Sequence, residues 1–184
     1  ELNYLNPFTP YVFSELEGDT EDYPFNNDNS MLFFSGRYRI GDRFSFYNEI
    51  IIDDLQVDKT GVDNAAGFKI GLDGYLNFIG NKLSWFFEWT KIDPWTYIHH
   101  GEYTSWQNRG HSLGYPYGSD CESFQFQGLY KFFKDTHLFF DLKFLKKGSN
   151  NLSTPWDNTN IDIVDHTFQN YNFMKISIIK TFDW

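Results

Sequence analysis

Apolar and polar residues alternate along most of this chain, and this alternation constrains the fold more than any other feature of the sequence. In residues 67–78 every second side chain is apolar or glycine, and most of those between are polar. Similar alternation recurs in residues 83–90, 122–132, 137–145 and 174–184, and more loosely in residues 31–40 and 43–57. A period of two residues is typical of β-strands with two unlike faces, and helical periodicity is nearly absent. The pattern predicts an all-β, antiparallel fold.

The connections between these runs also alternate, in length. Short turns occupy residues 41–42, 79–82 and 134–136, whereas long polar segments occupy residues 58–66, 100–120 and 148–165. Short turns on one rim and long loops on the other are typical of outer-membrane barrels. We therefore predict an antiparallel transmembrane β-barrel in a bacterial outer membrane, with extracellular long loops and a periplasmic C-terminus.

The composition is consistent with strands whose two faces lie in different environments. Aromatic residues make up 21% of the chain, although the mean hydropathy is -0.51. Apolar rows facing lipid and aromatic girdles at the interfaces would account for both values. The last strand ends at Trp184, which resembles the C-terminal signal that such barrels present to the barrel-assembly machinery. Outer-membrane lipid and this machinery are therefore predicted partners.

The polar rows would line the lumen. They carry mixed charges, at Arg37, Arg39, Arg43, Glu49, Lys69, Asp73, Glu88, Lys131, Asp141, Lys143 and Lys175. Rings of a single sign would favour an ion-selective channel. The mixture instead predicts a network of salt bridges and low conductance.

The sequence provides about eight strands if residues 4–14 form the first one. Pro7 and Pro10 weaken that segment, because proline donates no hydrogen bond to a strand ladder. The chain is then either one barrel domain over residues 1–184 or the C-terminal portion of a larger barrel, since it begins at Glu1 rather than at Met. A sheet edge in lipid must be paired, so another chain or a missing segment would complete an open barrel.

Charge and cysteine content exclude other classes. The net charge of -10 and a pI of about 4.8 argue against nucleic acid as a partner. No stretch approaches the ~18 apolar residues of a transmembrane helix. The single Cys121 excludes an intramolecular disulfide framework.

Residues 95–120 form the most unusual stretch, with aromatic and polar side chains interleaved. Aromatic rings can contact the apolar faces of sugars while polar side chains bind the hydroxyls. The alternative is that the loop folds into the barrel mouth and uses its aromatics as its own small core. The predicted glycan-binding residues are Trp95, Tyr97, His99, Tyr103, Trp106, Arg109, Tyr115, Tyr117 and Asp120.

The acidic residues after residue 52 are candidates for acid–base or metal chemistry. Asp53 and Asp54 are adjacent in a strand, so they point to opposite faces and cannot act as an acid–base pair. Asp58 and Asp63 could add oxygen ligands for Ca²⁺, but the spacing is not that of an EF-hand. We predict a cluster that solvates the rim.

Histidine and serine residues in the same region give no clear site. His99, His100 and His111 lack the spacing of a metal site. Ser112, next to His111, and Glu102 raise the possibility of a hydrolase, but nothing in their spacing specifies a triad. The sequence thus predicts no catalytic residue, no metal and no cofactor.

Several stretches together resemble the C-terminal part of the Wzi-type capsule-assembly outer-membrane proteins. They are "LNPF" (5–8), "NDNSMLFFSGRYRI" (27–40), "FYNEIIIDDLQVD" (46–58), "FEWTKIDPWTYIHH" (87–100) and "RGHSLGYPYGSD" (109–120). The resemblance implies a large barrel with a helical plug near its periplasmic side, of which this chain is only a portion. It also implies a lectin-like anchor for capsular polysaccharide.

We therefore expect a non-enzymatic protein that binds and organises capsular or extracellular polysaccharide at the surface of a Gram-negative cell. Three alternatives stay open at this point. They are a porin-like outer-membrane channel, an outer-membrane hydrolase and a soluble β-barrel with a ligand inside.

Overall fold

The computed structural model describes residues 31–53, 65–98, 107–108, 111–149 and 168–180. These residues form one seven-stranded antiparallel sheet and a separate pair of two-residue strands. The strands of the sheet are β1 (Leu32–Ile40), β2 (Phe44–Ile52), β3 (Ala66–Phe78), β4 (Asn81–Ile92), β7 (Cys121–Phe133), β8 (Thr136–Lys147) and β9 (Gln169–Lys180). The short pair is β5 (Gln107–Asn108) and β6 (His111–Ser112). The predicted all-β, antiparallel fold is confirmed for this part of the chain.

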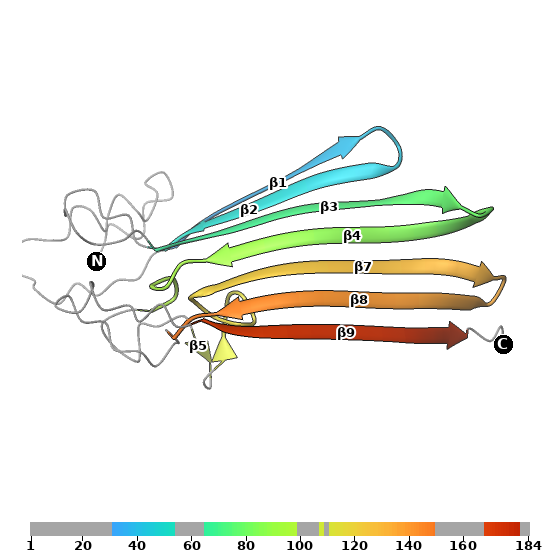
Figure 1. Ribbon diagram of the computed structural model, residues 1–184. Helices are drawn as coiled ribbons and strands as arrows, with labels where there is room; N and C mark the ends of the chain where they lie inside the picture. The colour runs from blue at the N-terminus through green and yellow to red at the C-terminus, as the bar shows by residue number, and fades with distance from the viewer. Residues whose placement is uncertain (1–30, 54–64, 99–106, 109–110, 150–167, 181–184) are drawn as a thin grey trace, which may run out of the picture.

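The sheet is a simple meander in which each strand pairs with the next one along the chain, in the order β1-β2-β3-β4-β7-β8-β9 (Figure 1). Tight turns at residues 41–43, 79–80 and 134–135 join strands at one end of the sheet, the turn end. The long connections 53–65, 93–120 and 148–168 lie between strand ends at the opposite end, the loop end. The predicted sorting of short and long connections is therefore confirmed. Among the described residues, no helix has the length and apolar character needed to cross a membrane.

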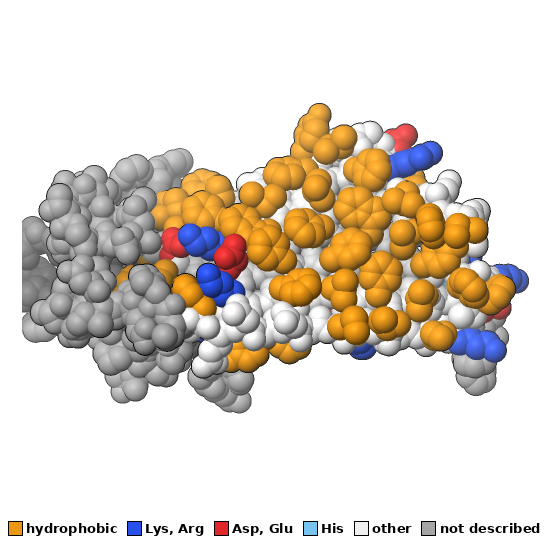
Figure 2. Space-filling model, in the orientation of Figure 1, with side chains coloured by type: hydrophobic (Ala, Val, Ile, Leu, Met, Phe, Trp, Pro, Cys, Tyr) orange, Lys and Arg blue, Asp and Glu red, His pale blue; other side chains and the backbone are white. Residues whose placement is uncertain are grey.

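One face of the sheet, the apolar face, exposes large hydrophobic side chains. In β3 it carries Ile70 and Leu72, and the strand register aligns it with Phe87 of β4, Phe126 of β7 and Met174 of β9. Met174 is 74% exposed and lies midway along the edge strand β9. Figure 2 shows apolar side chains spread over this face, with charged side chains mainly near its margins. At the loop end, one cross-strand row brings together Lys91, Glu122 and Lys146.

The opposite side, the polar face, carries the predicted lumen charges. Glu49 and Lys69 form an ion pair with 2.8 Å between Oε2 and Nζ, and Arg37 pairs with Asp73. Asp141 accepts hydrogen bonds from the side-chain amides of Gln125 and Gln127 at 3.0 and 2.9 Å. The Tyr47 hydroxyl donates to Glu88 at 2.8 Å. These cross-strand contacts are of the kind that mixed charges predict.

The buried core lies at the loop end rather than between two layers. One cluster contains Ile92, Tyr97, Cys121 and Leu145, and a second contains Ala65, Trp95 and Ile98. Residues 93–98 follow β4 and contribute to both clusters. This segment therefore packs against the ends of β4, β7 and β8 and against Ala65 before β3.

Within the described residues, the sheet is open, because β1 and β9 each pair with only one neighbour. Residues 4–14, which the sequence suggests as a further strand, lie outside the described residues, as does Trp184.

Candidate functional site: a cavity at the loop end of the sheet

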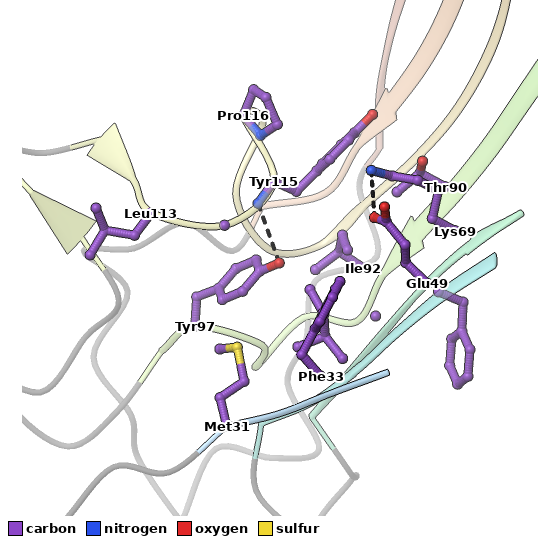
Figure 3. Close-up of a pocket in the computed structure, with 14 residues that line it drawn as sticks. Met31, Phe33, Glu49, Lys69, Thr90, Ile92, Tyr97, Leu113, Tyr115 and Pro116 are labelled. Carbon is purple, nitrogen blue, oxygen red and sulfur yellow. Dashed lines mark hydrogen bonds and ion pairs between the residues drawn. The ribbon is translucent and has the colours of Figure 1, made fainter. Parts of the chain in front are cut away.

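A cavity of about 470 Å³ opens on the polar face at the loop end (Figure 3). Strands β1 to β4 form its floor, and residues 113–116 approach it from the connection before β7. Its lining comprises Met31, Phe33, Glu49, Ile51, Gly67, Phe68, Lys69, Thr90, Ile92, Tyr97, Leu113, Gly114, Tyr115 and Pro116. Several strands must therefore be in register before the cavity exists.

The floor of the cavity is an apolar row on an otherwise polar face. The strand register places Phe33 opposite Ile51, Ile51 opposite Gly67, and Gly67 opposite Ile92. Gly67 leaves room in this row, because a Cβ atom there would lie 2.6 Å from Cδ1 of Ile92. This row makes the floor of the cavity apolar, and the floor adjoins the charged residues of the polar face.

The charged groups of the cavity neutralise each other. Glu49 and Lys69 are the paired residues described above, and their side chains are 35% and 26% exposed. Figure 3 places this pair at the side of the cavity towards the middle of the strands, near Thr90. Thr90 is buried, and its hydroxyl lies 3.5 Å from Glu88. The lining therefore contains an ion pair but no net charge from its carboxylates and amines.

Tyr97 forms the wall of the cavity next to residues 113–116. It is fully buried and has a φ of 72°, a left-handed conformation that costs free energy for a bulky residue. Its backbone N–H donates to the Asp53 carboxylate at the end of β2. Its hydroxyl accepts a hydrogen bond from the Tyr115 N–H at 3.3 Å. Burial is the main cause that raises the pKa of Tyr97 from 10.0 to about 12.

Tyr115 connects the cavity to a second, more accessible group of side chains. Its hydroxyl lies 2.6 Å from the Ser123 Oγ, and its ring centroid lies 5.6 Å from that of Tyr117. Lys143 Nζ of β8 lies 4.3 Å from the centroid of the Tyr117 ring, a favourable cation–π distance. Tyr115, Tyr117 and Lys143 thus form an aromatic and cationic cluster beside the cavity, which we call the tyrosine–lysine cluster.

The predicted glycan-binding residues fall into three groups. Tyr115 and Tyr117 are half-buried in the tyrosine–lysine cluster. Trp95, Tyr97 and Asp120 are buried, and the N–H of Asp120 donates to the Asp93 carbonyl at 3.2 Å. The others lie outside the described residues, and they are His99, Tyr103, Trp106 and Arg109. Trp95 and Tyr97 therefore belong to the two buried core clusters at the loop end.

The prediction that Asp53 solvates the rim is wrong. Asp53 is fully buried, and it accepts the Tyr97 N–H while its own N–H donates to the Ala65 carbonyl at 2.8 Å. The sequence could not show this, because the burial depends on the fold of residues 93–98 over the end of β2. Asp54, Asp58 and Asp63 lie outside the described residues.

Of the histidine, serine and glutamate candidates for metal binding or catalysis, His111 and Ser112 lie in the described part of the chain, where they form β6. The backbones of His111 and Ser112 pair with β5, while Glu102, His99 and His100 lie outside the described residues. Where the structure is described, no group of three or more His, Cys, Asp or Glu side chains is placed to hold a metal ion.

Sequence reasoning missed the cavity, although a signal for it was present. Three apolar residues lie on the polar face of their strands. Phe33 shares that face with Arg37, Ile51 shares it with Glu49, and Ile92 shares it with Thr90. Each is thus an apolar residue in a polar row, next to the loop end. Such coincident exceptions on neighbouring strands indicate an apolar site within a polar face.

No family model, no curated protein and no solved structure matches this chain.

Proposed function

We propose that this chain is part of a bacterial outer-membrane β-barrel that binds extracellular polysaccharide without catalysing a reaction. The observation that carries the membrane part is the exposed apolar face. The apolar row of β3 runs from Phe68 to Phe78, within the ~9–11 residues of a tilted membrane-crossing strand. Charged residues border the face at Lys91, Glu122 and Lys146, where a lipid headgroup region would begin.

A sheet that packs its apolar face into a core would bury these apolar side chains and expose its polar face. Here, the opposite face carries the ion pairs and the hydrogen-bonded glutamines, and it would face the lumen. In this orientation the long connections are extracellular and the C-terminus is periplasmic. Another segment or chain would complete the barrel, because a membrane leaves no edge unpaired.

Polysaccharide is the proposed ligand at the loop end. The tyrosine–lysine cluster offers two aromatic rings and a cation, which suit the apolar faces and the hydroxyls of sugars. The resemblance to the Wzi-type capsule-assembly proteins supports the same ligand class. The proposal extends to His99, Tyr103, Trp106 and Arg109 of the same connection on sequence grounds alone.

The test compares two matched aromatic residues on the polar face. Tyr117→Ala removes a ring that lies beside Lys143 at the loop end, and Tyr75→Ala removes a ring that lies 4.2 Å from Lys82 Nζ at the turn end. We expect Tyr117→Ala to reduce retention on immobilised capsular polysaccharide about fivefold, the effect of an aromatic contact of ~1 kcal/mol. Tyr75→Ala should be retained like the wild type.

Fractionation of Gram-negative cells that express the chain tests the location. The proposal expects the protein in the outer-membrane fraction and its release only by detergent. Recovery in buffer alone would contradict the membrane assignment, and equal retention of Tyr117→Ala and wild type would remove the tyrosine–lysine cluster from the site.

A further inference from the structure

We propose that the cavity at the loop end binds an uncharged amphipathic small molecule. Its apolar part packs on the row of Phe33, Ile51 and Ile92, and its polar end meets the Glu49–Lys69 pair. The proposal does not depend on polysaccharide binding, which we assign to the adjoining tyrosine–lysine cluster, although Tyr115 belongs to both the cluster and the cavity lining.

The size and lining of the cavity favour an alkyl or acyl group over a bare sugar. Its volume of about 470 Å³ lies in the usual range for small-ligand pockets, which are mostly apolar with a few polar groups. The two tyrosine hydroxyls of the lining already have partners, since that of Tyr97 accepts the Tyr115 N–H and that of Tyr115 contacts Ser123. A sugar would bring many hydroxyls to a site with few groups left to receive them, and each unsatisfied polar group costs free energy.

The ion pair determines the charge of the ligand. A carboxylate ligand would compete with Glu49 for Lys69, and an ammonium ligand would compete with Lys69 for Glu49. Either would leave a half-buried charge without its partner, which is unfavourable. An amide or hydroxyl head can donate to the Glu49 carboxylate and accept from the Lys69 ammonium while the 2.8 Å pair persists.

Protection of an introduced cysteine tests the proposal without any sugar present. Ile51→Cys places a thiol on the cavity floor, and Ser45→Cys places a matched thiol on the same face of β2, nearer the turn end. The protein is held in phosphatidylcholine nanodiscs and labelled with a maleimide, with hexanamide as the probe. Cys121 is 4% exposed, stays in both variants and is counted separately by peptide mass.

We expect hexanamide to protect the cavity thiol only. At about four times its dissociation constant it should slow labelling of Ile51→Cys about fivefold, because only the free fraction reacts. Labelling of Ser45→Cys should not change. Equal rates with and without hexanamide, or equal slowing at both positions, would overturn the proposal. Phe33→Cys, on the same floor, serves as a second reporter if Ile51→Cys does not fold.

The charge requirement has its own test with probes of equal chain length. Hexanoate and hexylammonium should protect Ile51→Cys less than hexanamide does. Adding Glu49→Gln removes the carboxylate partner of Lys69, so protection by hexanoate should increase relative to hexanamide. An unchanged order of the three probes in this double variant would overturn the assignment of the polar end. No polysaccharide is present in these labelling experiments. Their outcome therefore does not decide the polysaccharide-retention test, and the two proposals can fail separately.

Discussion

Tyr97 is the residue on which most of the loop-end geometry depends. Its backbone binds the Asp53 carboxylate, its hydroxyl receives the Tyr115 N–H, and its ring packs in the core cluster beside Ile92. A left-handed φ of 72° at a bulky residue persists only where the surroundings hold it. Through its backbone and its side chain, this one residue thus links the end of β2, the segment after β4 and residue 115 before β7.

Burial of Tyr97 predicts a dependence on alkaline pH. Since its pKa is raised from 10.0 to about 12, the folded state favours the neutral phenol. The resulting stability is fully present below pH 10 and is lost as the pH rises from about 10 towards 12. The measurement is the tyrosinate absorbance of the wild type minus that of Tyr97→Phe, with an expected midpoint near 12. A midpoint near 10 in the difference curve would show that the phenol is solvated.

Gly114 is predicted to be intolerant of a side chain because it contacts Tyr97. A Cβ atom at residue 114 would lie 2.3 Å from Cζ of the buried Tyr97 ring, so the segment would have to move. We expect Gly114→Ala to lower the free energy of unfolding by about 1–3 kcal/mol, the usual cost of overpacking. Denaturant titration measures this, with Leu113→Ala as control because Leu113 is 60% exposed. Equal losses in the two variants would contradict the packing argument.

At the scale of the elements, the turn between β3 and β4 places a β-branched residue in an unfavourable backbone conformation. Ile79 and Gly80 have φ angles of 49° and 77°, and Phe78 pairs with Asn81 across the turn. Positive φ at both central residues is the signature of a type I′ turn, for which Asn-Gly is preferred. Ile79 is β-branched and 78% exposed, so it gains little packing in return for an unfavourable backbone.

Ile79→Asn should therefore stabilise the hairpin. We expect a gain of about 1 kcal/mol, the order of the penalty for a residue with a Cβ in the left-handed region. Lys134→Asn in the turn between β7 and β8 is the matched control, because Lys134 is not among the positive-φ residues of the described chain. Unfolding midpoints of the two variants decide the question, and a loss of stability in Ile79→Asn would show that the Ile79 side chain has a packing role.

The strands could be predicted from sequence, whereas the way in which the cavity is enclosed could not. Alternation fixes which residues share a face, so the sides occupied by Lys69 and Ile70 were assigned correctly from residues 67–78 alone. The cavity depends on the register between four strands and on the position of residues 113–116. The apolar exceptions Phe33, Ile51 and Ile92 mark the cavity floor in the sequence, but they do not show which distant segments enclose it. For the same reason the burial of Asp53 was not predicted.

At the scale of the whole molecule, the distribution of exposed apolar area is the dominant feature. Met174, Ile176 and Ile178 of β9 are 74%, 65% and 75% exposed on the apolar face, while the buried core is confined to the loop end. An apolar surface of this extent marks an interaction site in a folded protein. Lipid is the partner that the proposed function assigns to it.

Met174→Arg distinguishes lipid from water on this face. In a bilayer we expect the substitution to cost about 2–4 kcal/mol, as for arginine near the midplane on the lipid side of a barrel. Ser177→Arg is the control, because residue 177 lies on the opposite face of the same strand. Folding titrations in phosphatidylcholine vesicles measure both. A Met174→Arg variant as stable as the wild type would mean that water surrounds that side chain.

The meander has one more consequence, which concerns direction. Six reversals separate the outermost strands, so β1 and β9 run the same way (Figure 1). If β1 paired with β9 of the same chain, or with β9 of an identical copy in the same membrane orientation, the two strands would be parallel. A ring in which all neighbours run in opposite directions needs an odd number of further strands, and a single strand from residues 4–14 would meet that requirement.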